Sequence, residues 1–396
     1  MIICDLSSFY CAKGGGVSTY HRARIDWFSR QNAHQYVLVS PGPRAGIQQI
    51  AESVWTVQVF GPRASGDADR YRLLLDGARF ADAHSFSAVW TPERHFDPFG
   101  GLYPNPSVTA AALAMITERV ALRAGSVVLP LHDPIRVAEE WAVVDNLSGG
   151  RAGLAFASGW HANDFALAPD PSVYERRKEV MRAHIETVRR LWHGDTTRVA
   201  NGVGREVELR TFPRPVQPEL PIWLAAAGSP ETFQLAGELG AGLLTHLLGQ
   251  NLTELADKTA IYRRAWRAAG HTGDGQVTLM AHTYVGTDAQ DVRELVREPF
   301  REYLRRSFGL VRSLAPSLGI DGEPTEEDIE ALLDHGFEHY YNGGALMGTV
   351  GECIAMAERI RETGVDEVAC LIDFGMDVEQ TMSSLELLDE VRAAVA

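Results

Sequence analysis

Short apolar segments alternate with helix-like segments along about 340 residues of this chain, and that alternation most limits its possible folds. Short apolar strands are typical of parallel sheets whose two faces are both covered by helices. Eight such strands joined by right-handed crossovers close into a β/α barrel. We therefore predict an α/β fold, a (β/α)8 TIM barrel with insertions. The predicted strands are 55–60, 88–90, 120–129, 152–157, 222–226, 242–246, 277–285 and 367–372.

Helix signals fill the gaps between the predicted strands. Asp133 before Pro134 is typical of a helix start, and Gly149 predicts where that helix ends. Apolar residues three and four positions apart predict its buried face. We expect that face to contain Val137, Ala138, Trp141, Val144 and Leu147.

Two stretches do not fit the repeat. Residues 195–220 are polar and Pro-rich, whereas residues 313–346 are acidic with a partly helical pattern. Long segments inserted in a compact fold often cover a binding site. We predict that both stretches are lids.

Residues 1–53 follow a different pattern. It predicts a strand at 2–6, a helix at 20–30 and a strand at 36–40, with a Gly-rich turn at 14–16. This is one βαβ unit, with nothing after it to complete a sheet. It resembles the start of a twin-Rossmann glycosyltransferase over some 40 residues, but the second domain of such an enzyme is missing. We expect residues 1–53 to be an extension that is not functional alone and lies outside a barrel of residues 54–396.

Composition restricts the partners. The net charge of −15 argues against nucleic acid and anionic membranes, because both require a basic surface. Four cysteines without a CxxC pair fit a reduced, cytoplasmic setting. We expect no signal peptide, because no basic region precedes an apolar stretch near Met1, and no run of 18 apolar residues could span a membrane. Because the net charge is negative, we expect an anionic cofactor to be held by local backbone dipoles and not by the overall field of the protein.

Polar residues follow several predicted strands where the strands end. Glu93, Arg94 and His95 offer a carboxylate, a guanidinium and an imidazole that can bind an anion or move a proton. Since the carboxyl ends of barrel strands share one face, a shared site is favoured over a simple Glu93–Arg94 ion pair. Trp160 could form the wall of a ring-binding site or pack in the core.

A second kind of strand end favours anions. Ala227, Gly228 and Ser229 are small residues before a predicted helix, whose free N–H groups can bind a phosphate. The alternative is an ordinary capped helix. His132 and His246 also follow strands, and each is read singly as a satisfied histidine at the barrel mouth. His335 to His339 matches an HxxEH zinc pattern, but Gly336 weakens the helix it needs, so we expect no metal.

Seven motifs resemble the bacterial-luciferase-like flavin monooxygenases, in the branch associated with polyketide and nonribosomal-peptide biosynthesis. The resemblance runs from about residue 55 to the end. The motifs are Tyr71–Leu75, Val89–Phe96, Gly100–Pro106, Ala124–Arg136, Ala155–His161, Thr245–Gln250 and Cys370–Gly375.

The resemblance implies the chemistry and the site. It implies reduced FMN from a separate reductase, and a flavin 4a-hydroperoxide that transfers one oxygen atom to an acyl or aminoacyl group on a carrier protein. It implies a homodimer and a non-prolyl cis peptide at 126–127 or 127–128. It places the phosphate at Ala227, Gly228 and Ser229, with Thr245 nearby. The implied ring contacts are Ser126, Val127, Ala157, Ser158 and Trp160.

Two positions depart from the family pattern. Luciferases have a histidine, their proposed base, where this chain has Arg94, so His95 would have to serve with Glu93. They also have a phosphate-binding arginine where this chain has Ser158. The alternative prediction is a deazaflavin-dependent hydride-transfer enzyme, since that group shares the fold.

Overall fold

The computed structural model describes residues 70–96, 102–306 and 325–395, together with the backbone of four strands within residues 1–60. The chain divides into two compact units, Met1–Tyr71 and Arg72–Ala396. Each unit is described by itself. No helix in the described residues is both long enough and apolar enough to cross a bilayer.

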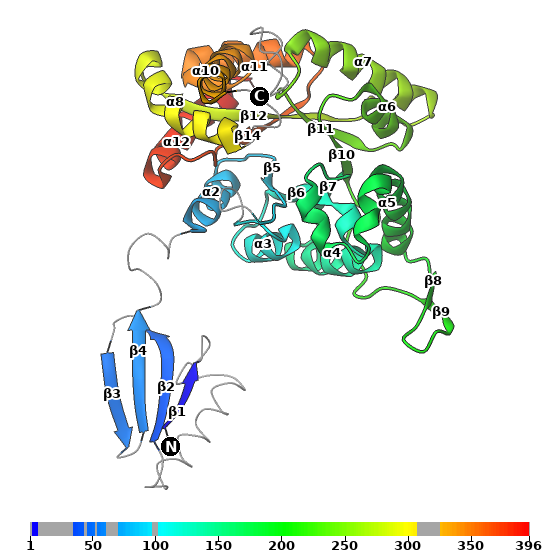
Figure 1. The fold of residues 1–396 in the computed structure, drawn as a ribbon, viewed down its shortest axis with the longest axis vertical. Coiled ribbons are helices and arrows are strands. Elements are labelled where there is room, and N and C mark those ends of the chain that lie inside the picture. Colours follow the sequence, from blue (N-terminus) through cyan, green and yellow to red (C-terminus); the bar gives the residue numbers. More distant parts are fainter. Residues whose placement is uncertain are drawn as a thin grey trace. The chain divides into compact units, whose positions relative to one another are not determined.

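The first unit contains a four-stranded sheet of β1 (Ile2–Leu6), β2 (Gln35–Gly42), β3 (Gly46–Ala51) and β4 (Val54–Phe60), in the order β1-β2-β4-β3 (Figure 1). The prediction that nothing completes this sheet is wrong, because β3 and β4 do so. The strand predicted at 55–60 exists as β4, but it pairs with β2 and β3 and not with a barrel strand. Only two residues separate β3 from β4, which favours antiparallel pairing between them. The predicted helix at 20–30 and the turn at 14–16 lie outside the described residues.

The second unit contains an eight-stranded sheet, and the recorded ladders between its strands are all parallel. The order is β13-β12-β11-β10-β7-β6-β5, and β14 pairs with β12. The α/β class is therefore confirmed, and seven of the predicted strands occur in this sheet. The bounds are β5 (Ala88–Thr91), β6 (Ala121–Val128), β7 (Ala152–Ala157), β10 (Ile222–Ala226), β11 (Gly242–His246), β12 (Val277–Gly286), β13 (Leu346–Thr349) and β14 (Glu367–Leu371).

Side chains connect β14 to the β5–β6 end of this sheet. Among the described strands, no backbone ladder joins β5 to β14. The Glu367 carboxylate on β14 instead accepts hydrogen bonds from Ser87 Oγ at 3.0 Å and from Arg123 Nη1 at 2.8 Å. Arg123 also stacks over Trp90 and Trp223, with its Cζ 5.1 and 4.5 Å from the ring centroids. A partly buried ion pair and cation–π contacts thus hold this region together.

Ten helices of the described part accompany this sheet (Figure 1). The Asp133 carboxylate caps α4, and Gly149 ends that helix in the left-handed conformation at φ 69°, as predicted. The prediction that Leu147 lies on the buried face is wrong, because its side chain is 47% exposed. The other four predicted residues of that face are buried. The helices are α2 (Arg72–Ala83), α3 (Pro106–Ala114), α4 (Pro134–Ser148), α5 (Arg177–His193), α6 (Pro230–Glu238), α7 (Leu252–Ala268), α8 (Ala289–Arg306), α10 (Glu326–Gly343), α11 (Val350–Glu362) and α12 (Val378–Val395).

The prediction that residues 195–220 form a lid over the site is wrong. This stretch contains the hairpin of β8 (Thr197–Ala200) and β9 (Glu206–Leu209). It joins the end of α5 to the start of β10, so it lies at the amino ends of the strands, away from the face where barrel sites form. Its anchors lie there too, since Gln217 O accepts from Trp192 Nε1 at 3.0 Å and Gln217 N–H donates to Asp145 at 2.9 Å.

The described part of the other insertion does reach the expected face. Helices α8 and α10 pack through Phe300, Phe337 and Tyr340 in an apolar cluster of their own beside the end of β12. Gly336 lies inside α10, which runs through it without a break. Residues 307–324 lie outside the described part.

Candidate active site

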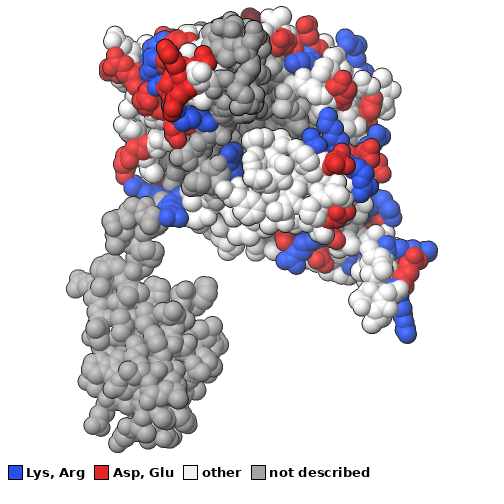
Figure 2. Space-filling model, viewed as in Figure 1, with Lys and Arg blue, Asp and Glu red and all other residues white. Residues whose placement is uncertain are grey.

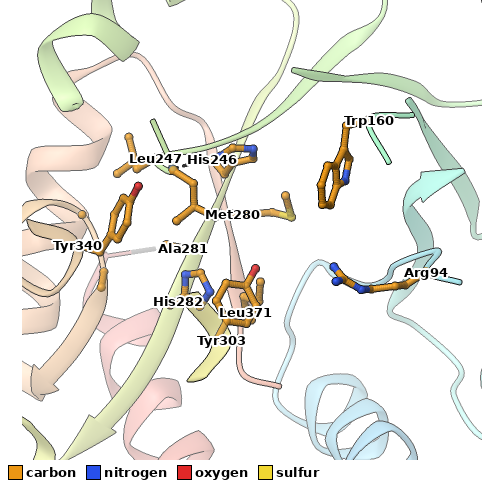
Figure 3. Close-up of a pocket in the computed structure, with 13 residues that line it drawn as sticks. Arg94, Trp160, His246, Leu247, Met280, Ala281, His282, Tyr303, Tyr340 and Leu371 are labelled. Carbon is orange, nitrogen blue, oxygen red and sulfur yellow. Dashed lines mark hydrogen bonds between the residues drawn. The ribbon is translucent and has the colours of Figure 1, made fainter. Parts of the chain in front are cut away.

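A pocket of about 180 Å³ opens among the strand ends (Figure 3). For comparison, a dry cavity of about 150 Å³ can hold a benzene molecule, so this pocket has room for a group of about one ring. Strands β11, β12 and β14, the segments after β5 and β7, and helices α8 and α10 all contribute to it. Its most informative side chains are Arg94, Trp160, His246, Met280, His282, Tyr303 and Tyr340.

Glu93 joins the ends of β5 and β6 beside this pocket. Its side chain is fully buried, and its carboxylate accepts hydrogen bonds from three groups. His132 Nε2 lies at 2.6 Å from Oε1, His95 Nε2 lies at 2.9 Å from the same oxygen, and Val128 N–H donates to Oε2 at 2.7 Å. Burial alone would raise the pKa of Glu93, but these hydrogen bonds, led by His132, lower the pKa below its ordinary value. Glu93 is thus an ionised anchor.

Among the three residues predicted as catalytic, only Arg94 lines the pocket. Figure 3 shows its guanidinium reaching into the cavity from the side opposite His282 and Tyr303. The His95 side chain is 9% exposed and directs Nε2 to the Glu93 carboxylate. The structure therefore brings His95 and Glu93 together behind the pocket wall and leaves a permanent cation in the cavity. A guanidinium can bind an anion but cannot accept a proton.

The β11–β12 side of the pocket carries two uncharged histidines. Burial lowers the pKa of His246 to about 4 and that of His282 to about 3. His282 is enclosed by Phe300 and Tyr303, with ring centroids 4.6 Å away in both cases. Neither imidazole contacts a carboxylate among the described residues, so nothing there restores the charged form.

A second site beside the pocket can hold an anion. The helix α6 begins at Pro230, and its N-cap Ser229 follows Gly228, whose φ of 107° suits glycine. A Cβ built on Gly228 would lie 3.4 Å from Lys258 Nζ, so that ammonium lies beside the start of the helix. Lys258 is fixed by donating to Gln250 Oε1 at 3.0 Å. A helix start, small residues and an ammonium together suit a phosphate.

Thr245 connects the two sites. Its hydroxyl donates to Ala226 O at 2.8 Å and accepts from Gln250 Nε2 at 3.0 Å. Gln250 also donates from Nε2 to the backbone oxygen of His246 at 2.6 Å. Thr245 is fully buried, so it supports the loop between the sites instead of facing a ligand.

The predicted ring contacts lie at the ends of β6 and β7. Ser126, Ala157 and Ser158 are half-buried, Val127 is buried, and Trp160 is 57% exposed at the pocket. Trp160 is therefore not a core residue. A Cβ on Gly159 would lie 2.8 Å from Val128 Cγ1 and 2.9 Å from Phe165 Cε2, which explains the glycine there. The non-prolyl cis peptide is Gly125–Ser126, one bond before the first of the predicted pair.

Sequence reasoning missed Lys258, Met280, Tyr303 and Tyr340. One signal was available, because Lys258 is one of only three lysines in the chain. It also lies next to the buried face of α7, which contains Leu255, Thr259 and Tyr262. Tyr340 comes from the insertion at 313–346, whose position the barrel repeat does not predict, and Tyr303 comes from α8 just before it.

The comparisons with known proteins identify the family. Residues 52–367 match the model of the luciferase-like monooxygenases. The oxygenase component of a flavin-dependent trigonelline monooxygenase from Acinetobacter baylyi is 28% identical over 82% of this chain and 89% of its own. A 4-hydroxyprotoasukamycin monooxygenase from Streptomyces nodosus subsp. asukaensis is 31% identical over 73% of this chain and 76% of its own. The chain belongs to the luciferase-like monooxygenase family, and the predicted enzyme class, a flavin-dependent monooxygenase, is confirmed.

Solved structures agree on the fold. The oxygenating constituent of 3,6-diketocamphane monooxygenase from Pseudomonas putida, in complex with FMN, aligns with a TM-score of 0.67 at 19% identity. The alignment covers 85% of this chain and 96% of that one. An F420-dependent secondary alcohol dehydrogenase aligns with a TM-score of 0.63 at 19% identity, over 83% of this chain and 96% of that one. The fold alone therefore accommodates both flavin and deazaflavin enzymes.

Proposed function

We propose that this chain is an FMN-dependent monooxygenase that uses reduced FMN and O2 to oxygenate a natural-product intermediate, namely an acyl or aminoacyl group on a carrier protein. The observation that carries this proposal is a phosphate-type anion site at the start of α6, with Lys258 of α7 beside it. This site lies next to a ring-sized pocket whose described lining includes one cation, Arg94. The substrate class rests on the family resemblance and on the Streptomyces relative.

In this proposal, the chain's residues hold the cofactor and shape the cavity. When bound, reduced FMN supplies the electrons that activate O2 for transfer of one oxygen atom. Ala227, Gly228, Ser229 and Lys258 bind the phosphate through backbone N–H groups and the ammonium. Arg94 stabilises negative charge that develops in the pocket. Ser126, Val127, Ala157, Ser158 and Trp160 contact the ring system, and the apolar walls exclude water.

A labelled-oxygen experiment tests the proposal. The protein would be titrated anaerobically with reduced FMN and then mixed with 18O2 and an acylated carrier protein. We expect stoichiometric FMN binding and one 18O atom in the acyl group. The same acyl group on N-acetylcysteamine is the control for the carrier. Loss of activity with that control would support carrier recognition, whereas equal activity would remove the carrier from the proposal. Absence of FMN binding would contradict the cofactor assignment.

A deazaflavin-dependent hydride transfer is the second proposal. It is favoured by the F420-dependent neighbour, and by an anion site that would suit the phosphate of either cofactor. Parallel titrations with reduced FMN and reduced F420 distinguish the two. Binding of F420 alone, with hydride transfer and no 18O incorporation, would move this proposal to first place.

A separate flavin reductase is the expected partner for reduced FMN. The printed description of the trigonelline enzyme as an oxygenase component supports a two-component arrangement. The chain should therefore oxidise added reduced FMN but show no NADH or NADPH oxidation by itself. Pyridine-nucleotide turnover by the purified chain would contradict this. We also propose a cytoplasmic location, which the four cysteines without a CxxC pair favour.

We also propose a homodimer through α3 and α4. Val108, Met115, Val143 and Leu147 are exposed apolar residues of α3, its C-cap and α4. Few charged side chains are visible over this region of Figure 2. Apolar surface of this kind marks an association site. Light scattering should give twice the chain mass, and Leu147→Glu should give a monomer. A monomeric wild-type chain would overturn the proposal, and exposed Val203→Glu on the β8–β9 hairpin is the control.

The extension is proposed to have no part in the chemistry. A chain that begins at Arg70, without the whole sheet to which β4 belongs, should keep FMN binding and turnover, since each described residue of the site follows Arg70. Loss of turnover with intact folding would show that the residues before Arg70 contribute to the mechanism.

A further inference from the structure

His246 is held in one orientation by hydrogen bonds at the end of β11. Its Nδ1 accepts a hydrogen bond from Leu248 N–H at 3.1 Å. An amide N–H can only donate, so Nδ1 is the unprotonated nitrogen of the neutral ring and Nε2 carries the proton. The backbone oxygen of His246 is fixed separately by Gln250 at 2.6 Å. Both the tautomer and the orientation are therefore determined by the fold.

The protonated nitrogen has no hydrogen-bond partner within the described residues. His246 lines the pocket. Its Nε2 is not one of the fully buried atoms without a hydrogen-bond partner in the described residues, so it is accessible from the cavity. In Figure 3 the nitrogen-bearing edge of the ring faces the space in front of Trp160, beside Met280. The Nε2–H donor lies close to an indole, a thioether and aliphatic carbons, and such surroundings suit an uncharged group with an acceptor atom.

We propose that His246 Nε2–H binds the carbonyl oxygen of the substrate and so orients a ring-sized, uncharged acyl or ketone group in this pocket. This inference rests on the proposed function and specifies the group that the site recognises. The opposite pocket wall supplies the cation, Arg94, so a carboxylate would be drawn there instead. His246 is thus a positioning residue that selects a neutral carbonyl. The pKa of about 4 agrees, because the ring stays neutral at physiological pH.

Two isosteric probes test the donor directly. Cyclohexanone carries the acceptor, whereas methylenecyclohexane has the same shape without it. Binding of each probe would be measured by NMR titration of the full chain, with and without saturating FMN. The free energy of transfer from water differs between the two probes. This difference cancels when the ratio of their Kd values is compared between the wild type and a variant. Removing the donor should lower the relative affinity for the ketone about fivefold.

Matched substitutions separate the two ring nitrogens. His246→Asn can keep an acceptor for Leu248 N–H but does not reach the Nε2 position, so it should lose the preference for the ketone. His246→Gln places an amide N–H near the Nε2 position and should restore most of it. Tyr303→Phe removes another hydroxyl at the pocket and should leave the preference unchanged. Loss of preference in Tyr303→Phe but not in His246→Asn would overturn the proposal.

The wild-type chain gives a second, independent readout. Imidazole 15N spectra should show the Nε2–H tautomer for His246, and cyclohexanone should shift that resonance while methylenecyclohexane should not. A Nδ1–H tautomer, no shift, or no binding of either probe would overturn the inference. Tighter binding of cyclohexanecarboxylate that depends on Arg94 would do the same. FMN binding, measured in the same samples, reports separately on the proposed function.

Discussion

Histidines on the two sides of the pocket mouth have pKa values shifted in opposite directions. On the β5–β6 side, His132 lies against the buried Glu93 carboxylate at 2.6 Å. Burial alone would lower the pKa of His132, but the hydrogen bond and charge of Glu93 raise it above its ordinary value. On the β11–β12 side, burial lowers the pKa of His246 to about 4 and that of His282 to about 3, without a carboxylate to oppose it.

The difference shows that the partner decides the charge of a buried imidazole. The first side is an ionic anchor that holds two strand ends and offers few atoms to the pocket. The second side is a neutral wall whose donors and rings face the cavity. A site built in this way can bind a neutral group on one wall and stabilise charge on the other, where Arg94 lies.

The largest effect is expected when the ionic anchor is removed. Glu93→Ala leaves two imidazoles and the Val128 N–H without their acceptor in a buried position. Breaking such a buried set costs about 3–5 kcal/mol of unfolding free energy. Urea unfolding should show this loss, and Glu386→Gln, on an exposed part of α12, should change almost nothing. Equal stability of Glu93→Ala and the wild type would show that the cluster does not anchor the strands.

Lys258 provides a test on the neutral side of the pocket, because it is a cation that lies near this side and contributes to the proposed anion site. Lys258→Met should weaken FMN binding about 30-fold, since a charge-assisted contact to a phosphate is worth about 2 kcal/mol. Riboflavin, which lacks the phosphate, should bind the variant and the wild type alike. Arg264→Met, on an exposed position of the same helix, is the charge-matched control. A similar loss for riboflavin would place the role of Lys258 elsewhere.

The neutral side predicts a specific pH dependence. The folded pKa of His282 lies below the unfolded value of about 6.5, so between these values the unfolded chain binds more protons. Stability from this group is therefore lost as pH falls below 6.5. His282→Phe should reduce the loss of unfolding free energy between pH 7 and pH 5 by about 2 kcal/mol. Replacing exposed His339 by Phe should leave the pH profile unchanged. An unchanged profile for His282→Phe would show that this imidazole is not held neutral.

Sequence periodicity predicted most of the second unit because burial on both faces leaves a strong local signal. β7, β10 and β11 have the predicted bounds. The failures have physical reasons. β4 is a strand as predicted, but its pairing partner is chosen by nonlocal contacts that a strand pattern does not contain. Leu147 continues the helix spacing of α4, yet its position is exposed.

The candidate site was predictable only where it follows strand ends. Arg94 and Trp160 were predicted as site residues because topology brings strand ends together, whereas His246 was placed at the barrel mouth but read as a satisfied histidine. Which of Arg94 and His95 enters the pocket was not predictable, since it depends on the Glu93 hydrogen bonds formed with β6 and the loop after it. Tyr303 lies on α8 and Tyr340 on α10, and the placement of these two helices depends on nonlocal packing through Phe300 and Phe337.

The smallest effect on unfolding free energy is expected for an exposed ion pair outside the pocket. Glu338 belongs to the HxxEH pattern of α10, and its carboxylate pairs with Arg293 at a site where both side chains are more than one third exposed. Solvent screens such a pair, so Glu338→Gln should cost less than about 1 kcal/mol of unfolding free energy. Zinc should not raise the unfolding temperature of either protein, because among the described residues no cluster of metal-binding side chains occurs. A zinc-dependent stabilisation that disappears in Glu338→Gln would instead make this motif a metal site, and the exposed face of α10 would then need a functional explanation of its own.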